Sequence, residues 1–74
     1  MPLHRLDARG INCPRPVMKI ALMASEMLPG DILEVVGDCP TFETDVRAWC
    51  SRLKKALLFV HNGEGYEKTV QIRF

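Results

Sequence analysis

One stretch of the sequence, Asp31-Ile32-Leu33-Glu34-Val35-Val36-Gly37-Asp38-Cys39-Pro40, decides the fold. Its Ile, Leu and Val residues form a largely apolar run, which is typical of a strand buried in the middle of a sheet. Pro29-Gly30 ends the element before it, and Pro40 is suited to the first turn of the helix that follows. The stretch therefore predicts a central strand flanked by two helices.

Outward from this strand, the hydrophobic periodicity predicts the remaining elements. We expect helices over residues 14–28 and 40–55, and strands over 3–7, 31–37, 57–61 and 66–74, with a turn at 62–65 marked by Asn62-Gly63. The order is β-α-β-α-β-β, which predicts an α+β fold. Its form is a two-layer α/β sandwich, in which two helices cover one face of a four-stranded mixed sheet. We expect a single domain over residues 1–74.

Each predicted helix carries an apolar stripe at spacings of three and four residues. The stripe of the first comprises Val17, Ile20, Ala21, Ala24, Met27 and Leu28, and that of the second comprises Phe42, Val46, Trp49, Cys50 and Leu53. Met18, Leu22 and Met23 near the first stripe either complete the edge of the core or form an exposed contact patch. We expect both aromatic rings and Cys50 to be core residues, not a base-stacking platform or a site.

The size and charge of the chain limit the classes of function. A chain of 74 residues with a net charge of +1 is too short to enclose a deep pocket and is not a polyanion binder by charge. No apolar run approaches the roughly 20 residues of a spanning helix, and the first residues lack the apolar stretch of a signal peptide. We therefore expect a cytoplasmic monomer with no membrane insertion and no direct nucleic-acid contact.

The three cysteines, Cys13, Cys39 and Cys50, are an odd number without close pairing. This pattern argues against a disulfide framework. His4 and His61 have no cysteine pair at ligand spacing, so we expect no metal site, and nothing in the sequence indicates a cofactor.

Cys13 has the surroundings of a reactive thiol. Pro14 suits the first position of a helix, so Cys13 lies at the positive end of the helix dipole, where a thiolate is favoured and the thiol pKa falls. Because Pro16 lacks an N–H group, the backbone N–H of Arg15 is the expected donor to the sulfur, which predicts a moderately lowered pKa. Arg15, Lys19 and Arg9 are the cations that we expect around the thiol, where they would face an acidic partner.

Residues 37–40 repeat the pattern of residues 10–14: a glycine ends a strand, and a Cys-Pro pair opens a helix. If the two strands are parallel neighbours, Cys13 and Cys39 lie at the same edge of the sheet. Cys39 is then either an inert residue beside a helix cap, or a second thiol of low pKa. A second thiol would form a disulfide with Cys13, or accept a group that Cys13 carries.

The segment Leu6-Asp7-Ala8-Arg9-Gly10-Ile11-Asn12-Cys13-Pro14-Arg15-Pro16 resembles the Cys-Pro-x-Pro motif of the TusA/SirA-like sulfur carriers. Weaker similarity extends through residues 29–35, 45–49 and 72–73, so the resemblance covers essentially the whole chain. It implies a fold like that of the C-terminal domain of translation initiation factor 3. It also implies that Cys13 accepts sulfane sulfur as a persulfide from a cysteine desulfurase or rhodanese and passes it to an acceptor protein.

The chain departs from the family at two places. Cys39 stands where members commonly have an acidic residue, and Lys54-Lys55 stands where they often have Gly-His after the second helix. Because the second change removes a helix-stopping glycine, we expect that helix to run slightly longer.

The resemblance implies a relay in tRNA thiolation, molybdenum cofactor synthesis or dissimilatory sulfur oxidation. On this interpretation Cys13 carries the sulfur, Pro14, Arg15, Pro16, Arg9 and Lys19 support it, and the protein acts as a persulfide relay and not as a free-standing multi-turnover enzyme. Two alternatives stay open. One is a thiosulfate-processing thiol enzyme partnered with a transporter, and the other is a non-catalytic regulatory or RNA-binding domain.

Overall fold

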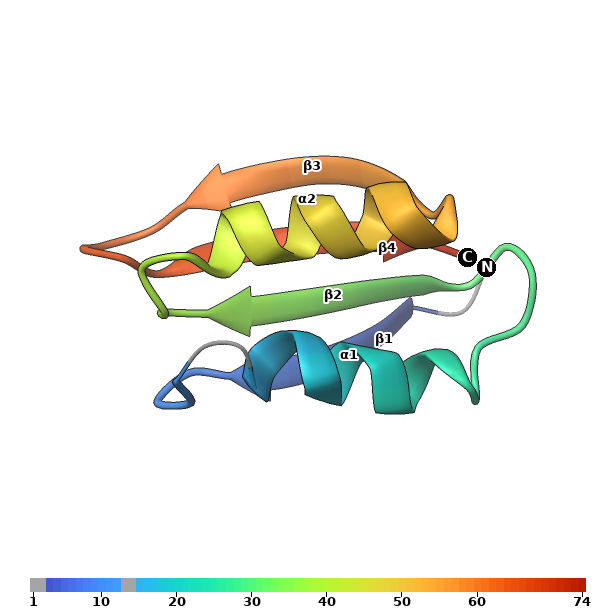
Figure 1. Ribbon diagram of the computed structural model, residues 1–74, viewed down its shortest axis with the longest axis horizontal. Coiled ribbons are helices and arrows are strands. Elements are labelled where there is room, and N and C mark those ends of the chain that lie inside the picture. Colours follow the sequence, from blue (N-terminus) through green and yellow to red (C-terminus); the bar gives the residue numbers. More distant parts are fainter. Residues whose placement is uncertain (1–2, 13–14) are drawn as a thin grey trace.

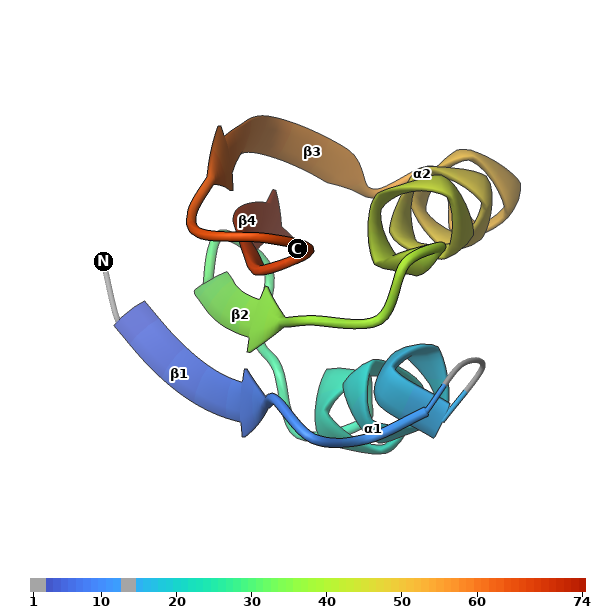
Figure 2. The same cartoon turned by 90° about the vertical axis from the view of Figure 1, so that its left-hand side faces the viewer.

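The computed structural model describes residues 3–12 and 15–74. Its elements are β1 (Leu3–Ala8), α1 (Arg15–Ala24), β2 (Ile32–Gly37), α2 (Phe42–Leu53), β3 (Ala56–Asn62) and β4 (Lys68–Arg73) (Figure 1). Seen from the end in Figure 2, α1 and α2 both lie on one side of the sheet. The predicted α+β sandwich is therefore confirmed in its element order and its layers.

The sheet has the strand order β1-β2-β4-β3. β1 pairs with β2 in parallel, with Ala8 opposite Gly37, while β4 is antiparallel to both β2 and β3. This arrangement confirms that the strand from Ile32 to Gly37 is central. It also means that β1 and β2 end at the same edge of the sheet.

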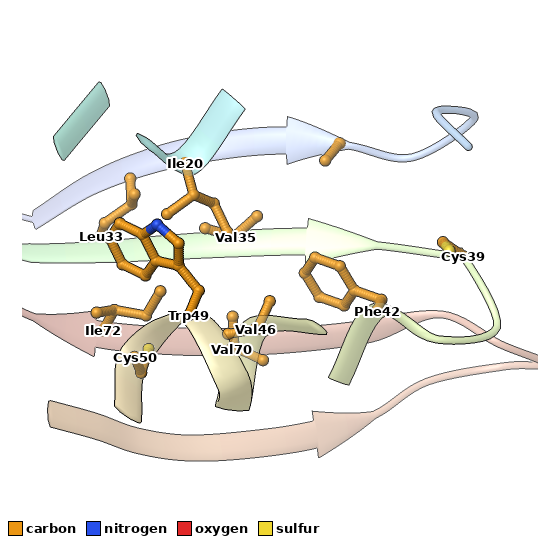
Figure 3. Packing of buried hydrophobic residues seen from close by; sticks show 11 residues of the cluster. Ile20, Leu33, Val35, Cys39, Phe42, Val46, Trp49, Cys50, Val70 and Ile72 are labelled. Carbon is orange, nitrogen blue, oxygen red and sulfur yellow. The ribbon is translucent and has the colours of Figure 1, made fainter. Parts of the chain in front are cut away.

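The core lies between the helices and the sheet, as the alternation of the strands requires. Figure 3 shows Leu33 and Val35 of β2 near Ile20 and Val70 of β4 near Val46. These strand residues and Ile72 are fully buried. The helices contribute the remaining large side chains of this cluster, namely Ile20, Phe42, Val46, Trp49 and Cys50. Both aromatic rings and Cys50 are thus core residues, as the spacing predicted.

α1 ends at Ala24, four residues before the predicted end at Leu28. The Ser25 hydroxyl donates to the Leu22 carbonyl at 2.8 Å, and the Leu28 N–H donates to the buried carboxylate of Asp31 at 3.1 Å. Side-chain bonds of this kind compete with the helical ladder. The helix therefore gives way to turns before Leu28.

Three residues of the predicted stripes are exposed. Ala21 faces solvent because the buried face of α1 runs through Pro16 and Ile20. Leu28 is 66% exposed because it lies beyond the helix, and Leu53 is 46% exposed because α2 ends there. The helical spacing of apolar residues is therefore correct, but the spacing alone does not determine which side of a helix faces the core or where the helix ends.

The end of α2 also differs from the prediction. The helix stops at Leu53, and Lys54 adopts the left-handed conformation, with φ 58° and ψ 40°, that a glycine would favour. The Lys55 N–H donates to the Cys50 carbonyl at 2.8 Å and the Lys54 N–H to the Ser51 carbonyl at 3.3 Å, which is the Schellman arrangement. The helix is therefore not lengthened by the loss of a glycine, because Lys54 takes over the glycine's conformation.

The last strand begins at Lys68, two residues later than predicted. The Gly63 N–H donates to the Glu67 carbonyl at 2.7 Å and the Glu67 N–H to the Glu64 carbonyl at 2.9 Å. These two bonds hold residues 63–67 as a turn, so Tyr66 belongs to the turn and is exposed. The alternation from Val70 onwards is as predicted.

Candidate functional site

The candidate site is the edge of the sheet at which β1 and β2 end. Figure 1 shows the two turns that follow these strands side by side at one end of the molecule. We call residues 9–12 the first turn and residues 38–41 the second turn. The Gly10 N–H donates to the Asp38 carboxylate at 2.9 Å, so a hydrogen bond joins the two turns directly. The predicted proximity of the two turns requires the two strands to be parallel neighbours, and β1 and β2 meet this condition.

Arg9 opens the first turn and is bound to Asp7. Its Nε and Nη2 atoms donate to the two carboxylate oxygens at 3.0 and 2.9 Å, and its backbone N–H adds a third bond at 3.0 Å. These hydrogen bonds lower the pKa of Asp7 from its usual 3.8 to about 2. The guanidinium predicted to face an acidic partner is thus already paired within the chain.

Cys13 and Pro14, the residues predicted to carry and support the sulfur, lie outside the described residues. The chain on either side of them forms a turn, because the Arg15 N–H donates to the Asn12 carbonyl at 3.0 Å. The sequence assigned that N–H group to the sulfur, and the structure gives it a backbone acceptor instead. Since Pro16 has no N–H group, it offers no backbone donor in the first turn of α1.

The beginning of α1 has a buried side and an exposed, basic side. Pro16 is fully buried against the core, while Arg15 and Lys19 are exposed. Met18 and Leu22 lie on the same exposed surface, with exposed fractions of 60% and 73%. The start of α1 thus presents cations next to apolar side chains. Met23, by contrast, packs against the core.

Cys39 lies in the second turn and is buried, with 6% of its surface exposed. It is disulfide-bonded, contrary to the expectation from the odd number of cysteines. Its Sγ lies 3.6 Å from the Thr41 hydroxyl oxygen, and its carbonyl accepts the Phe42 N–H at 3.0 Å.

A close approach between Gly37 and Phe42 sets the position of the second turn. A Cβ atom on Gly37 would lie 2.8 Å from two carbons of the Phe42 ring, closer than packed atoms allow. The ring therefore fills the space that any side chain at position 37 would need. The sequence marks Gly37 only as the end of a strand, so this constraint could not be read from it.

Cys50 provides the contrast to Cys39. It is a free thiol that is 3% exposed on the inner face of α2, and burial raises its pKa. Figure 3 places it at the opposite end of the core from Cys39, which lies beyond the end of β2. A buried thiol with a raised pKa is a poor nucleophile. Cys50 is therefore a packing residue.

A hollow of about 340 Å³ lies over β1 and β2 on the side where Arg5 and Glu34 form an ion pair at 3.4 Å. Its lining residues are Arg5, Leu6, Asp7, Arg9, Glu34, Val36, Glu67 and Thr69. Three carboxylates oppose two guanidinium groups in this hollow. That charge balance does not favour a small dianion such as thiosulfate.

A comparison with known protein families identifies the family of this chain. A family model described as sulfurtransferase TusA matches residues 4–73. The chain belongs to the TusA sulfurtransferase family, whose members act in sulfur relay between donor and acceptor proteins. The resemblance drawn from the motif is thereby confirmed over nearly the whole chain.

Neither of the helices that the structure describes has the length and apolar character to cross a bilayer.

Proposed function

We propose that this protein carries sulfane sulfur as a persulfide on Cys13 and relays it from a donor protein, a cysteine desulfurase or a rhodanese, to an acceptor protein. The thiolate of Cys13 attacks the outer sulfur of the donor's persulfide. A new sulfur–sulfur bond forms on Cys13, the donor's sulfur–sulfur bond breaks, and the donor leaves as a thiolate. The family match over residues 4–73 supports this role.

The start of α1 is the observation that carries the proposal. The helix begins at Arg15, so Cys13 precedes its positive end, and its first turn reads Arg15-Pro16-Val17-Met18. Arg15 and the helix dipole both favour a thiolate at this place. Because the Arg15 N–H is bound to Asn12, we expect the pKa of Cys13 to be lowered moderately. A thiolate near ambient pH is also the better nucleophile for passing sulfur on.

The exposed surface of α1 supports a protein partner. Arg15 and Lys19 supply positive charge, and Met18 and Leu22 supply apolar contact area beside it. A partner with an acidic rim around an apolar contact fits this surface. The supporting role of Arg9 stays a prediction, because its guanidinium is held by Asp7.

The test is sulfur loading measured by intact mass. The reduced protein is incubated with a cysteine desulfurase and cysteine, and separately with thiosulfate alone. We expect one added sulfur atom from the desulfurase, loss of that addition in Cys13→Ser, and its retention in Cys50→Ala, which keeps the first turn intact. A thiol pKa of Cys13 at or above that of free cysteine would count against the mechanism.

The same experiment separates the alternatives. Turnover of thiosulfate by the protein alone would favour a thiosulfate-processing enzyme, and an absence of loading under both conditions would favour a regulatory domain. The pathway that receives the sulfur, whether tRNA thiolation, molybdenum cofactor synthesis or sulfur oxidation, stays a prediction. Transfer from the loaded protein to purified acceptors of each pathway is the measurement that decides it.

A further inference from the structure

We propose that two copies of this chain pair through β3, an outer strand of the sheet, to form a symmetric dimer. The dimer departs from the monomer expected from the sequence, and it does not rest on the proposed function. It assigns an occupant to an apolar edge that the sulfur relay does not use.

β3 is paired on one side only. In the sheet formed within residues 3–12 and 15–74, the strand order is β1-β2-β4-β3, so β3 (Ala56–Asn62) pairs with β4 alone. Figure 1 shows β3 along the upper margin of the molecule. An outer strand presents backbone N–H and C=O groups that can pair with a further strand. The outer side of β3 is therefore a template for one more strand.

The two outer strands of the sheet differ in charge. β1 carries Arg5 and Asp7, whose side chains are 75% and 58% exposed, and charges on an outer strand oppose association between strands. β3 reads Ala-Leu-Leu-Phe-Val-His-Asn and contains no Asp, Glu, Lys, Arg or Pro. Strong strand preference with low charge is typical of segments that associate. Of the two edges, β3 is therefore the one suited to pairing.

Two large apolar side chains of β3 are exposed. Leu58 is 41% exposed, and Phe59 is 45% exposed. Phe59 lies opposite Gln71 of β4, on the face of the sheet that the helices leave uncovered. The register shifts between Leu57 and Phe59, so a β-bulge interrupts the edge at this point. In a dimer each copy covers apolar surface of the other, and the bulge keeps the shared ladder short and the dimer weak.

The charges that flank β3 favour a second copy in antiparallel orientation. Lys54 and Lys55 precede the strand, and Glu64 and Glu67 follow it. Within the described part of the chain, no ion pair joins Lys54 or Glu64 to another residue. An antiparallel pair brings the lysine end of one β3 to the glutamate end of the other, and the two-fold symmetry makes this contact twice. The edge is thus complementary to itself.

Pairing through β3 leaves the candidate site accessible. β3 and β1 lie at opposite edges of the sheet, and the first turn follows β1. Each copy also keeps the basic surface of α1, on which Arg15 and Lys19 are exposed. The dimer therefore presents two open copies of the site.

The test is the mass of the full chain in solution, measured by sedimentation equilibrium up to about 1 mM protein in a reducing buffer that excludes disulfides between chains. We expect wild type to form a reversible dimer. Phe59→Lys should weaken it about tenfold, because a lysine on an outer strand opposes pairing. Leu28→Lys is the matched control, since Leu28 is 66% exposed but lies beyond the end of α1, and it should dimerise like wild type. Amide NMR spectra check that each variant is folded.

A charge exchange tests the orientation of the two strands. Lys54→Glu and Glu64→Lys each place like charges across the interface, so we expect either substitution to weaken the dimer about threefold. The double variant restores opposite charges and should recover the wild-type affinity. Single variants that dimerise like wild type, or a double variant that does not recover, overturn the antiparallel pairing.

Three further results would overturn the dimer. One is a wild-type protein that stays monomeric at about 1 mM. Another is a Phe59→Lys variant that dimerises as well as Leu28→Lys. The third is protection of the β3 amides from hydrogen exchange only after a cysteine desulfurase is added, which would assign this edge to a strand of a partner protein. None of these results decides sulfur loading, which tests the carrier function separately.

Discussion

The two strand–turn–helix units of this protein share a sequence pattern, but the helices that follow their turns begin with opposite charges. In the first unit the turn leads into a helix whose first turn carries Arg15, and the surface of that helix is exposed and basic. In the second unit Cys39 is buried, and the helix begins with the carboxylates of Glu43 and Asp45. Arg15 adds to the positive potential at the start of α1, whereas Glu43 and Asp45 oppose it at the start of α2, so the start of α1 is the one that favours a thiolate.

The glycines of the two turns offer the strongest way to test this comparison. Gly37→Ala forces a Cβ against the Phe42 ring at 2.8 Å, so we expect a loss of about 2 kcal/mol in the free energy of unfolding. Denaturant unfolding measures this loss, and the disulfide state of Cys39 should change with it because the second turn must move. An unchanged stability would show that Phe42 repacks without cost.

Gly10→Ala is the matched control in the first turn. A Cβ on Gly10 meets none of the described atoms within 4 Å, but the residue has a φ of 77°, which costs an L side chain about 1 kcal/mol. We expect a smaller loss of stability than for Gly37→Ala, from backbone conformation alone.

The end of the second helix allows a smaller test. Lys54→Gly removes the strain of a lysine at φ 58°, so we expect a gain of about 1 kcal/mol in stability, measured by denaturant unfolding. Lys54→Ala should give no such gain, because alanine meets the same backbone restriction. A destabilised Lys54→Gly variant would indicate that the lysine side chain itself contributes to the fold.

The smallest expected effect concerns the ion pair beside the first turn. Pairing with Arg9 lowers the pKa of Asp7 from 3.8, its value in the unfolded chain, to about 2. The pair therefore contributes its full stabilisation at pH values above 3.8 and loses it as the pH falls through 2. In Arg9→Ala we expect NMR titration to show the Asp7 pKa back near its usual value. An unshifted pKa would mean that groups other than Arg9 hold the carboxylate.

Periodicity was sufficient to predict the layers of the fold. Val35, Val46 and Ile72 are buried because strand and helix periods point them inward, whatever the details of the loops. Element ends were less predictable, since the Asp31 carboxylate takes the Leu28 N–H and so ends α1 early. Such a bond depends on the tertiary position of Asp31, which no local pattern encodes.

The proximity of the two turns was predictable only in part. The repeated pattern placed Cys13 and Cys39 at one edge on the condition that the two strands are parallel, and the parallel pairing of β1 with β2 meets that condition. Three features needed the folded chain: the bond between Arg15 and Asn12, the close approach of Gly37 to Phe42, and the disulfide of Cys39. Each of these features depends on packing or on turn geometry, which the spacing of hydrophobic residues does not determine.

The parallel pairing of β1 with β2 also determines when this site comes into existence during folding. A parallel pair cannot close through a tight hairpin and must wait for its long crossover, here the segment that contains α1. The hydrogen bond from Gly10 to Asp38 therefore forms only after this crossover has closed, and protection of the Gly10 N–H from hydrogen exchange reports on the tertiary structure of the two turns.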